Sequence, residues 1–243
     1  MNEQKPDFST KSYLFPPINK EGKRFGFIAL ALTALYIVLV HVVGCHFEMA
    51  RLARVMGFFG IPFLLLSYGV FLFFRDPERY PPEDEKAILS PADGRICLIQ
   101  DVPLPEELGE DQSKKYWRVS VFMSVFNVHV NRMPTKGTIL KKAYVKGKFI
   151  NASLDKASKD NERCNYLVEA FDGSRYGVTQ IAGLVAKRIV PFVDEGAKLE
   201  KAERFGLIRF GSRLDVYLPE GVKPEVRLGQ IMVAGETVLG HLV

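Results

Sequence analysis

Gly211 and Ser212 form a pair whose residue types suit an attack of the chain on itself. Glycine tolerates strained backbone angles and leaves its own carbonyl carbon open to attack. The hydroxyl of the serine that follows can fold back onto that carbonyl as a nucleophile. A Gly-Ser pair is also a common turn, and taken alone this structural explanation is the stronger one.

Acid–base chemistry has two candidates, Asp93 and His129. Asp93 precedes Gly94, and an Asp-Gly turn is the ordinary explanation for such a pair. Apart from His241 near the C-terminus, His129 is the only histidine after the apolar N-terminal part. Histidine is the side chain best suited to move protons near neutral pH, although a single histidine in a strand is usually structural. A charged stretch at 156–163 is a further candidate, with a solvated loop as its ordinary explanation.

Two apolar segments precede the part of the chain that carries these candidates. They run from Phe25 to Cys45 and from Val55 to Phe74, and each is long enough to cross a bilayer as a helix. Neither shows the polar stripe of a half-buried helix, which disfavours a pair of core helices. A lipoprotein-type signal ending at Cys45 is disfavoured by the second segment.

The charges that flank these segments predict their orientation. Lysine and arginine are concentrated before the first segment and after the second, so both ends are expected in the cytoplasm. We therefore expect a cytoplasmic basic leader at 1–24 and a transmembrane helical hairpin at 25–74, with spans at 25–45 and 55–74.

The composition changes at Arg75, where a charged, proline-rich linker begins. Beyond it, β-branched and aromatic runs alternate with turn residues, which predicts a mainly β (α+β), barrel-like catalytic domain at 75–243. The segment 103–115 is expected to be a loop, and 180–187 is the one candidate for a short helix. The expected strands are 96–101, 117–122, 137–145, 165–170, 176–181, 189–193, 214–218 and 231–233.

Cysteine spacing and net charge limit the kinds of site and partner that the protein is expected to have. Cys45, Cys97 and Cys164 show no paired spacing, so the sequence predicts neither a zinc site nor a disulfide framework. A formal net charge of +5 suits a nucleic acid or an anionic surface. Beside two apolar segments the anionic bilayer is the better explanation, and we expect no nucleic-acid partner.

Six short motifs resemble, in the same order, those of the phosphatidylserine decarboxylase proenzymes. Each match is weak alone, whereas six in order over the last two thirds of the chain are hard to explain otherwise. The Gly-Ser-Arg sequence and the short length resemble the compact branch of the family, since longer relatives have Gly-Ser-Thr or Gly-Ser-Ser. The motifs are Phe-Phe-Arg-Asp-Pro at 73–77, Ser-Pro-Ala-Asp-Gly at 90–94, the His129 segment at 122–134, Asn-Glu-Arg at 161–163, Gln-Ile-Ala-Gly at 180–183 and Phe-Gly-Ser-Arg at 210–213.

The resemblance implies a pyruvoyl-dependent carboxy-lyase of phospholipid biosynthesis, which makes phosphatidylethanolamine and carbon dioxide from phosphatidylserine. The proenzyme would cleave itself between Gly211 and Ser212 into a large (beta) chain, 1–211, and a small (alpha) chain, 212–243. Ser212 would become a covalent pyruvoyl group, whose ketone condenses with the serine amine and accepts the electrons released as carbon dioxide leaves. No metal or added cofactor is expected.

The same resemblance implies acid and base roles for Asp93 and His129. Asp93 would orient or assist proton removal during self-cleavage, and His129 would transfer protons in cleavage, decarboxylation or both. The sequence departs from the familiar pattern at Arg132, where longer relatives have a second histidine three residues after the first. The family's division of roles between two histidines therefore does not carry over.

Family habit suggests a homodimer, held at the inner membrane with the catalytic domain on the cytoplasmic face. Two other functions stay open at this stage. One is a pyruvoyl decarboxylase acting on another serine-headed lipid or a different amino acid. The other is a non-enzymatic, membrane-tethered β module, because 228–240 faintly resembles half of a lipoyl or biotinyl carrier barrel. That segment has no lysine to carry the modification, so we interpret it as architecture.

Overall fold

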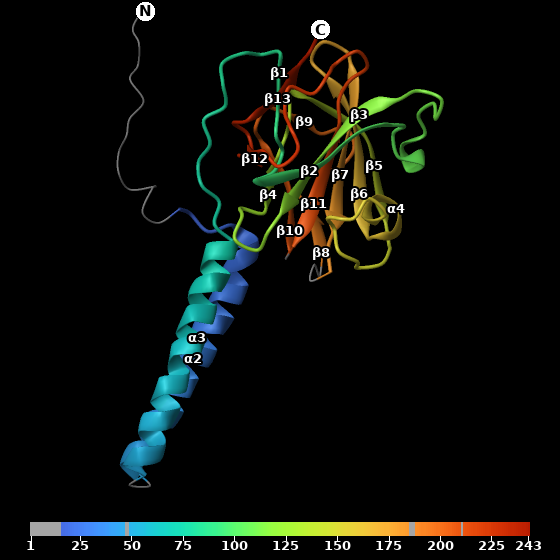
Figure 1. The fold of residues 1–243 in the computed structure, drawn as a ribbon. Coiled ribbons are helices and arrows are strands. Elements are labelled where there is room, and N and C mark those ends of the chain that lie inside the picture. The colour runs from blue at the N-terminus through green and yellow to red at the C-terminus, as the bar shows by residue number, and fades with distance from the viewer. Residues whose placement is uncertain (1–15, 47–48, 185–187, 210) are drawn as a thin grey trace, which may run out of the picture. The chain divides into compact units, whose positions relative to one another are not determined.

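A computed structural model describes residues 16–46, 49–184, 188–209 and 211–243, and the chain divides into two units, Met1–Glu78 and Arg79–Val243. The first unit is built on two long helices, α2 (Lys20–His46) and α3 (Ala50–Phe73), which pack side by side (Figure 1). Polar groups of the pair point inward: the hydroxyls of Thr33 and Ser67 are 2.9 Å apart. Both apolar segments are therefore helical, as expected.

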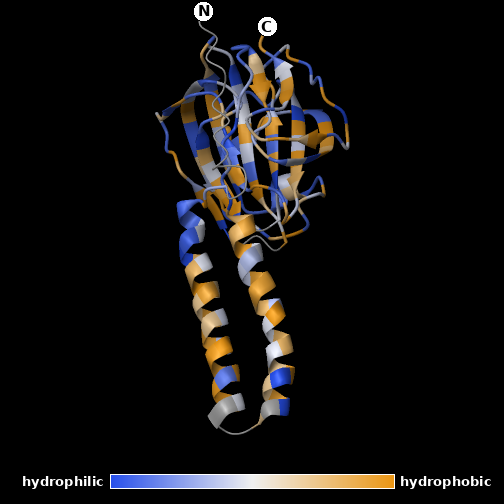
Figure 2. Cartoon of the chain, turned by 90° about the vertical axis from the view of Figure 1, so that its left-hand side faces the viewer, coloured by the Kyte–Doolittle hydropathy of each residue, from blue (hydrophilic) through white to orange (hydrophobic). Residues whose placement is uncertain are grey.

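Between their charged ends, these helices have a mainly apolar outward surface. Figure 2 shows both of them mainly in the colour of hydrophobic residues. Phe58 is 70% exposed and Leu35 is 66% exposed. Both helices are long and apolar enough to cross a membrane, and water would solvate such a surface poorly.

The second unit is mainly β, which confirms the expected fold class. Its strands form three sheets, in the orders β12-β2-β3-β11-β7-β6-β5-β9, β4-β10-β8 and β1-β13 (Figure 1). The largest sheet is open between β12 and β9 in the described residues, so it is not a closed barrel. The strands are β1 (Ala87–Leu89), β2 (Gly94–Val102), β3 (Tyr116–Met123), β4 (Val130–Arg132), β5 (Gly137–Val145), β6 (Arg163–Ala170), β7 (Arg175–Ala182), β8 (Arg188–Pro191), β9 (Lys198–Leu199), β10 (Arg204–Arg209), β11 (Ser212–Tyr217), β12 (Ile231–Met232) and β13 (Val238–His241).

The two faces of the eight-stranded sheet differ sharply in chemistry. On β11, Leu214 and Val216 belong to the apolar core, and Ser212 shares their face because side chains alternate along a strand. The three-stranded sheet lies across this core, where the rings of Tyr166 and Phe205 meet edge to face at 5.3 Å. The opposite face is the more polar one. It carries the buried Arg213 and Asp215 beside a smaller apolar cluster that includes Leu167 and Tyr217, and it is covered by the 3-10 helix η1 (Glu106–Leu108) and the short helix α4 (Ala157–Asp160).

All eight expected strands are present, with ends shifted by a few residues. The helix expected at 180–187 is wrong at its start, because 180–182 pair with β11 and β6 as the last residues of β7, and 185–187 lie outside the described residues. The loop expected at 103–115 contains η1, whose Leu108 is buried. Five strands were not expected: β1, β4, β9, β10 and β13.

Candidate active site

The Gly211-Ser212 pair lies where the chain enters the middle of the largest sheet. Ser212 is the first residue of β11 and lies opposite Met123 of β3 on one side and Ala182 of β7 on the other. Its side chain is fully buried, with Oγ 4.0 Å from the sulfur of Met123. Gly211 has a φ of +58°, a left-handed conformation that favours glycine. The sequence thus needs glycine at the residue whose carbonyl the serine would attack.

Gly183 lies directly against this carbonyl. A Cβ at position 183 would be 2.1 Å from the Gly211 oxygen, so only glycine fits there without a shift of the backbone. The motif Gln-Ile-Ala-Gly at 180–183 therefore ends at the candidate cleavage site.

His129 is held on the strand pair that leads to Gly211. It precedes β4, which pairs with β10, and its carbonyl accepts a hydrogen bond from the Ile208 amide at 3.4 Å. The side chain is fully buried, and Nδ1 is 2.9 Å from the carbonyl oxygen of Asn127. Because a carbonyl oxygen only accepts, Nδ1 is the nitrogen that donates the proton in this contact.

Asp93 is engaged in an ion pair at the far side of β3. Its carboxylate accepts two hydrogen bonds from one nitrogen of Arg79, at 2.8 and 3.0 Å, and a third from the amide of Ala234 at 2.8 Å. The next residue, Gly94, packs so closely on β3 that a Cβ there would be 2.2 Å from the Phe122 oxygen. Asp93 therefore directly precedes β2, which pairs with β3 on the side away from β11 and Ser212. Its carboxylate is paired with the guanidinium of Arg79.

A chain of hydrogen bonds between buried polar side chains leads from the core to Met123, next to Ser212. The Tyr166 hydroxyl donates to Gln180 Oε1 at 2.9 Å, and Gln180 Nε2 donates to Asn131 Oδ1 at 2.8 Å. Asn131 Nδ2 then contacts the Met123 sulfur at 3.7 Å, next to Ser212 Oγ. Burial raises the pKa of Tyr166, so its hydroxyl stays protonated and remains a donor. The sequence did not predict this network, although Gln180 belongs to the Gln-Ile-Ala-Gly motif at 180–183.

Arg213 and Asp215 anchor the other face of β11. Both are fully buried, and two hydrogen bonds of 2.8 and 2.9 Å join the guanidinium to the carboxylate. Arg213 also donates to the carbonyl oxygens of Ala152 and Leu154, at 3.1 and 2.8 Å. The charged pair thus ties the loop before α4 to the strand that Ser212 begins.

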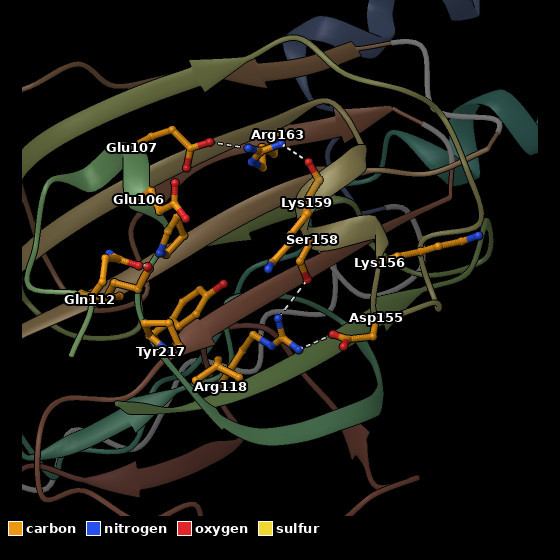
Figure 3. A pocket seen from close by; sticks show the side chains of 14 residues that line it. Glu106, Glu107, Gln112, Arg118, Asp155, Lys156, Ser158, Lys159, Arg163 and Tyr217 are labelled. Atoms are coloured by element: carbon orange, nitrogen blue, oxygen red, sulfur yellow. Dashed lines mark hydrogen bonds and ion pairs between the residues drawn. The ribbon is translucent and has the colours of Figure 1, made fainter. Parts of the chain in front are cut away.

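The polar face also holds a cavity of about 590 Å³, shown in Figure 3. Arg118 and Tyr217 line it from β3 and β11, and they point away from the face that carries Ser212. Ion pairs of Arg118 with Asp155 and of Arg163 with Glu107 occupy much of its wall (Figure 3). The cavity is therefore distinct from the Gly211-Ser212 pair. No group of side chains suited to a metal ion occurs in the described part of the chain.

Comparison with known proteins gives one consistent family. The family model described as phosphatidylserine decarboxylase matches residues 69–240. Three similar relatives are each named phosphatidylserine decarboxylase proenzyme. The one from Novosphingobium aromaticivorans is 47% identical over 96% of this chain and 90% of its own length. That from Zymomonas mobilis is 47% identical over 99% and 94%, and that from Ruegeria pomeroyi is 51% identical over 93% and 95%.

Proposed function

Because the chain belongs to the phosphatidylserine decarboxylase family, we propose that it is a proenzyme that converts phosphatidylserine to phosphatidylethanolamine and carbon dioxide. The conformation of the Gly211-Ser212 pair carries this proposal. A glycine with positive φ presents its carbonyl at the start of a buried strand, and the next side chain is the only hydroxyl on that strand's core-facing side.

Self-cleavage at this pair follows from the chemistry of the two residues. Ser212 Oγ attacks the Gly211 carbonyl carbon, and the peptide C–N bond breaks to leave an ester and a free amine. Loss of the Ser212 α-proton then breaks the Oγ–Cβ bond, which releases Gly211 as a carboxylate and leaves a dehydroalanine. Water hydrolyses that residue to a pyruvoyl group and ammonia.

The surroundings of Ser212 fit such a group. The position is fully buried beside Met123 and an apolar core, which would shield a ketone from water. When formed, the pyruvoyl group supplies the electron sink for decarboxylation.

We assign proton transfer to His129 and a supporting role to Asp93. Histidine is the side chain best suited to move protons near neutral pH, and His129 directly precedes β4, whose partner β10 leads to Gly211, so we assign it as the base for the Ser212 hydroxyl or α-proton. Asp93 is paired with Arg79 and accepts a hydrogen bond from the Ala234 amide, so we assign it the role of orienting the neighbouring turn.

The fold explains how two chains would remain together after the cut. The small chain, 212–243, would contribute β11, β12 and β13, and every strand partner of these three lies in the large chain, 1–211. The Ala234 amide would also donate across the two chains to Asp93. Strand pairing therefore supports a mature enzyme of two tightly held chains.

The apolar helices support a location at the membrane. The excess of lysine and arginine before the apolar segment at Phe25 and after the one that ends at Phe74 favours both ends in the cytoplasm. We place the catalytic unit at the cytoplasmic face of the inner membrane, where a lipid substrate is at hand.

The decisive experiment is intact mass measurement of the denatured full-length protein. We expect two chains, with the smaller beginning at residue 212 and carrying the mass of a pyruvoyl end. Ser212→Ala should stay whole, whereas Ser120→Ala, which alters a buried serine on the adjacent strand β3, should be cut normally. A single uncut wild-type chain that forms no phosphatidylethanolamine in vesicles would overturn the proposal.

A further inference from the structure

Large apolar side chains are exposed on three loops of the second unit. The first loop is the turn after β3, the second lies between β5 and α4, and the third consists of Gly183 and Leu184 directly after β7. We call these the three rim loops. The exposed residues on them are Val125 (45%), Phe126 (74%), Phe149 (39%), Leu154 (45%) and Leu184 (70%).

Strand register places the rim loops around the start of β11. Met123 and Ala182, which lie opposite Ser212, are the last residues of β3 and β7, so two of the loops leave the sheet beside Ser212. The other loop contains Ala152, whose Cβ is 3.3 Å from the position that a Cβ on Gly183 would take. The exposed apolar residues thus share one end of the sheet with Ser212.

The charges on these loops are mainly positive. The turn at 124–129 has no lysine, arginine, aspartate or glutamate. In the second loop and α4, Asp155 is paired with Arg118, and Asp160 lies 3.9 Å from the Lys148 ammonium. The lysines of this segment are Lys146, Lys148, Lys156 and Lys159. Exposed apolar side chains on loops with an excess of lysines are typical of a surface that enters the interface of an anionic bilayer.

We propose that the three rim loops dock into the bilayer that contains the substrate, so that a lipid head group reaches Ser212 without leaving the membrane. This inference rests on the proposed function, because an anionic two-chain lipid is what the site would have to receive. Withdrawing two acyl chains into water is strongly unfavourable, so the buried Ser212 must meet its substrate at the membrane surface. A second copy of the chain would not need the excess of lysines.

Depth-dependent quenching tests the docking directly. Trp117 is the only tryptophan and lies near the beginning of β3, at the opposite end from Met123, so a Trp117→Phe background leaves the protein without one. In bilayers of brominated and anionic lipids, full-length protein with Phe126→Trp or Leu184→Trp should be quenched. Phe171→Trp is the matched control, because Phe171 is 48% exposed on the turn at the opposite end of β6 and β7. Quenching at 171 equal to that at 126 and 184, or none at the latter two, would overturn the proposal.

Turnover gives an independent readout. Phe126→Gln combined with Leu184→Gln should lower the ratio of activity on bilayer phosphatidylserine to activity on a monomeric short-chain phosphatidylserine by about tenfold. Phe171→Gln should leave that ratio unchanged, and an unchanged ratio in the double variant contradicts the docking. If the unaltered protein decarboxylates neither lipid, the proposed function fails, whereas the quenching result still decides the docking.

Discussion

The carbonyl oxygen of Gly211 occupies the space that a side chain on Gly183 would need. A Cβ on Gly183 would be 2.1 Å from that oxygen and 3.0 Å from the carbonyl carbon. The Asn161 side chain holds this part of the backbone, since its Nδ2 donates to the Ala182 carbonyl at 2.6 Å. Because both sides of the contact are backbone, neither can move aside by a change of rotamer.

Gly183→Ala should therefore displace the scissile carbonyl and slow self-cleavage by about a hundredfold or more. The fraction of cut chain over time measures this. Hydroxylamine, which cleaves esters, should release little fragment, because the ester itself would form slowly. Gly137→Ala is the matched control: its Cβ would also meet backbone, 2.4 Å from the Glu169 oxygen, but in β5. Equal cleavage rates in the two variants would refute the positioning role.

His129→Ala should slow self-cleavage, decarboxylation or both by roughly 10²–10⁴-fold, the usual contribution of a general acid or base. Intact mass reports the first reaction and carbon dioxide release the second. His241→Gln serves as the histidine control, since His241 lies on β13 in a separate sheet. A His129→Ala protein that performs both reactions at normal rates would remove His129 from the mechanism.

Asp215→Ala should destabilise the catalytic unit by about 3–5 kcal/mol, because it leaves the buried Arg213 guanidinium without its carboxylate. Thermal unfolding of the full-length protein in detergent should show a fall in Tm on the order of 10 °C. The double variant Arg213→Met with Asp215→Leu should recover part of that loss, because no unpaired charge remains buried. If the loss in free energy of unfolding in the double variant equals the sum of the losses in the two single variants, Arg213 and Asp215 do not act as a unit.

His241 should make the association of the cleaved chains depend on pH. Its hydrogen bond with Glu225, and then the charges of Glu225 and Asp84, raise the pKa of His241 above the ordinary value of about 6.5. A raised folded-state pKa stabilises the complex below the ordinary pKa, and this contribution is lost as pH rises through the raised value. His241→Gln should therefore lower the urea midpoint of chain separation more at pH 5.5 than at pH 8.5. An equal change at both pH values would contradict this linkage.

Local sequence patterns were enough to predict the helices and the longer strands. The apolar helices are long, and strands such as β5 and β6 are rich in β-branched and aromatic residues. Short strands such as β4 and β13 exist because distant segments pair with them, which no local pattern reveals. Residues 180 and 181 belonged both to an expected strand, 176–181, and to a candidate helix, 180–187. Pairing with neighbouring strands places them in β7, so tertiary pairing decides between the two there.

Residue types and family motifs pointed to the candidate residues, but not to the contacts between residues that are distant in the sequence. Neighbouring residues such as Gly211 and Ser212 could be paired by inspection, but the contact of Gly183 with Gly211 depends on the register of β7 against β11. The Tyr166–Gln180–Asn131 chain likewise joins three strands from two sheets. Its members look like ordinary strand residues until the fold brings them together.

The central place of β11 has a consequence for the lifetime of the enzyme. The strand lies between β3 and β7, and it is there that the chain would be cut. Before the cut, β11 pairs with its neighbouring strands within one chain. After the cut, an unfolded small chain would have to bind the large chain again in a bimolecular step. The mature form would then be maintained by the barrier to unfolding rather than by its ability to refold. Each molecule would assemble its largest sheet once, as a precursor, and an unfolded mature enzyme would have to be replaced by new synthesis.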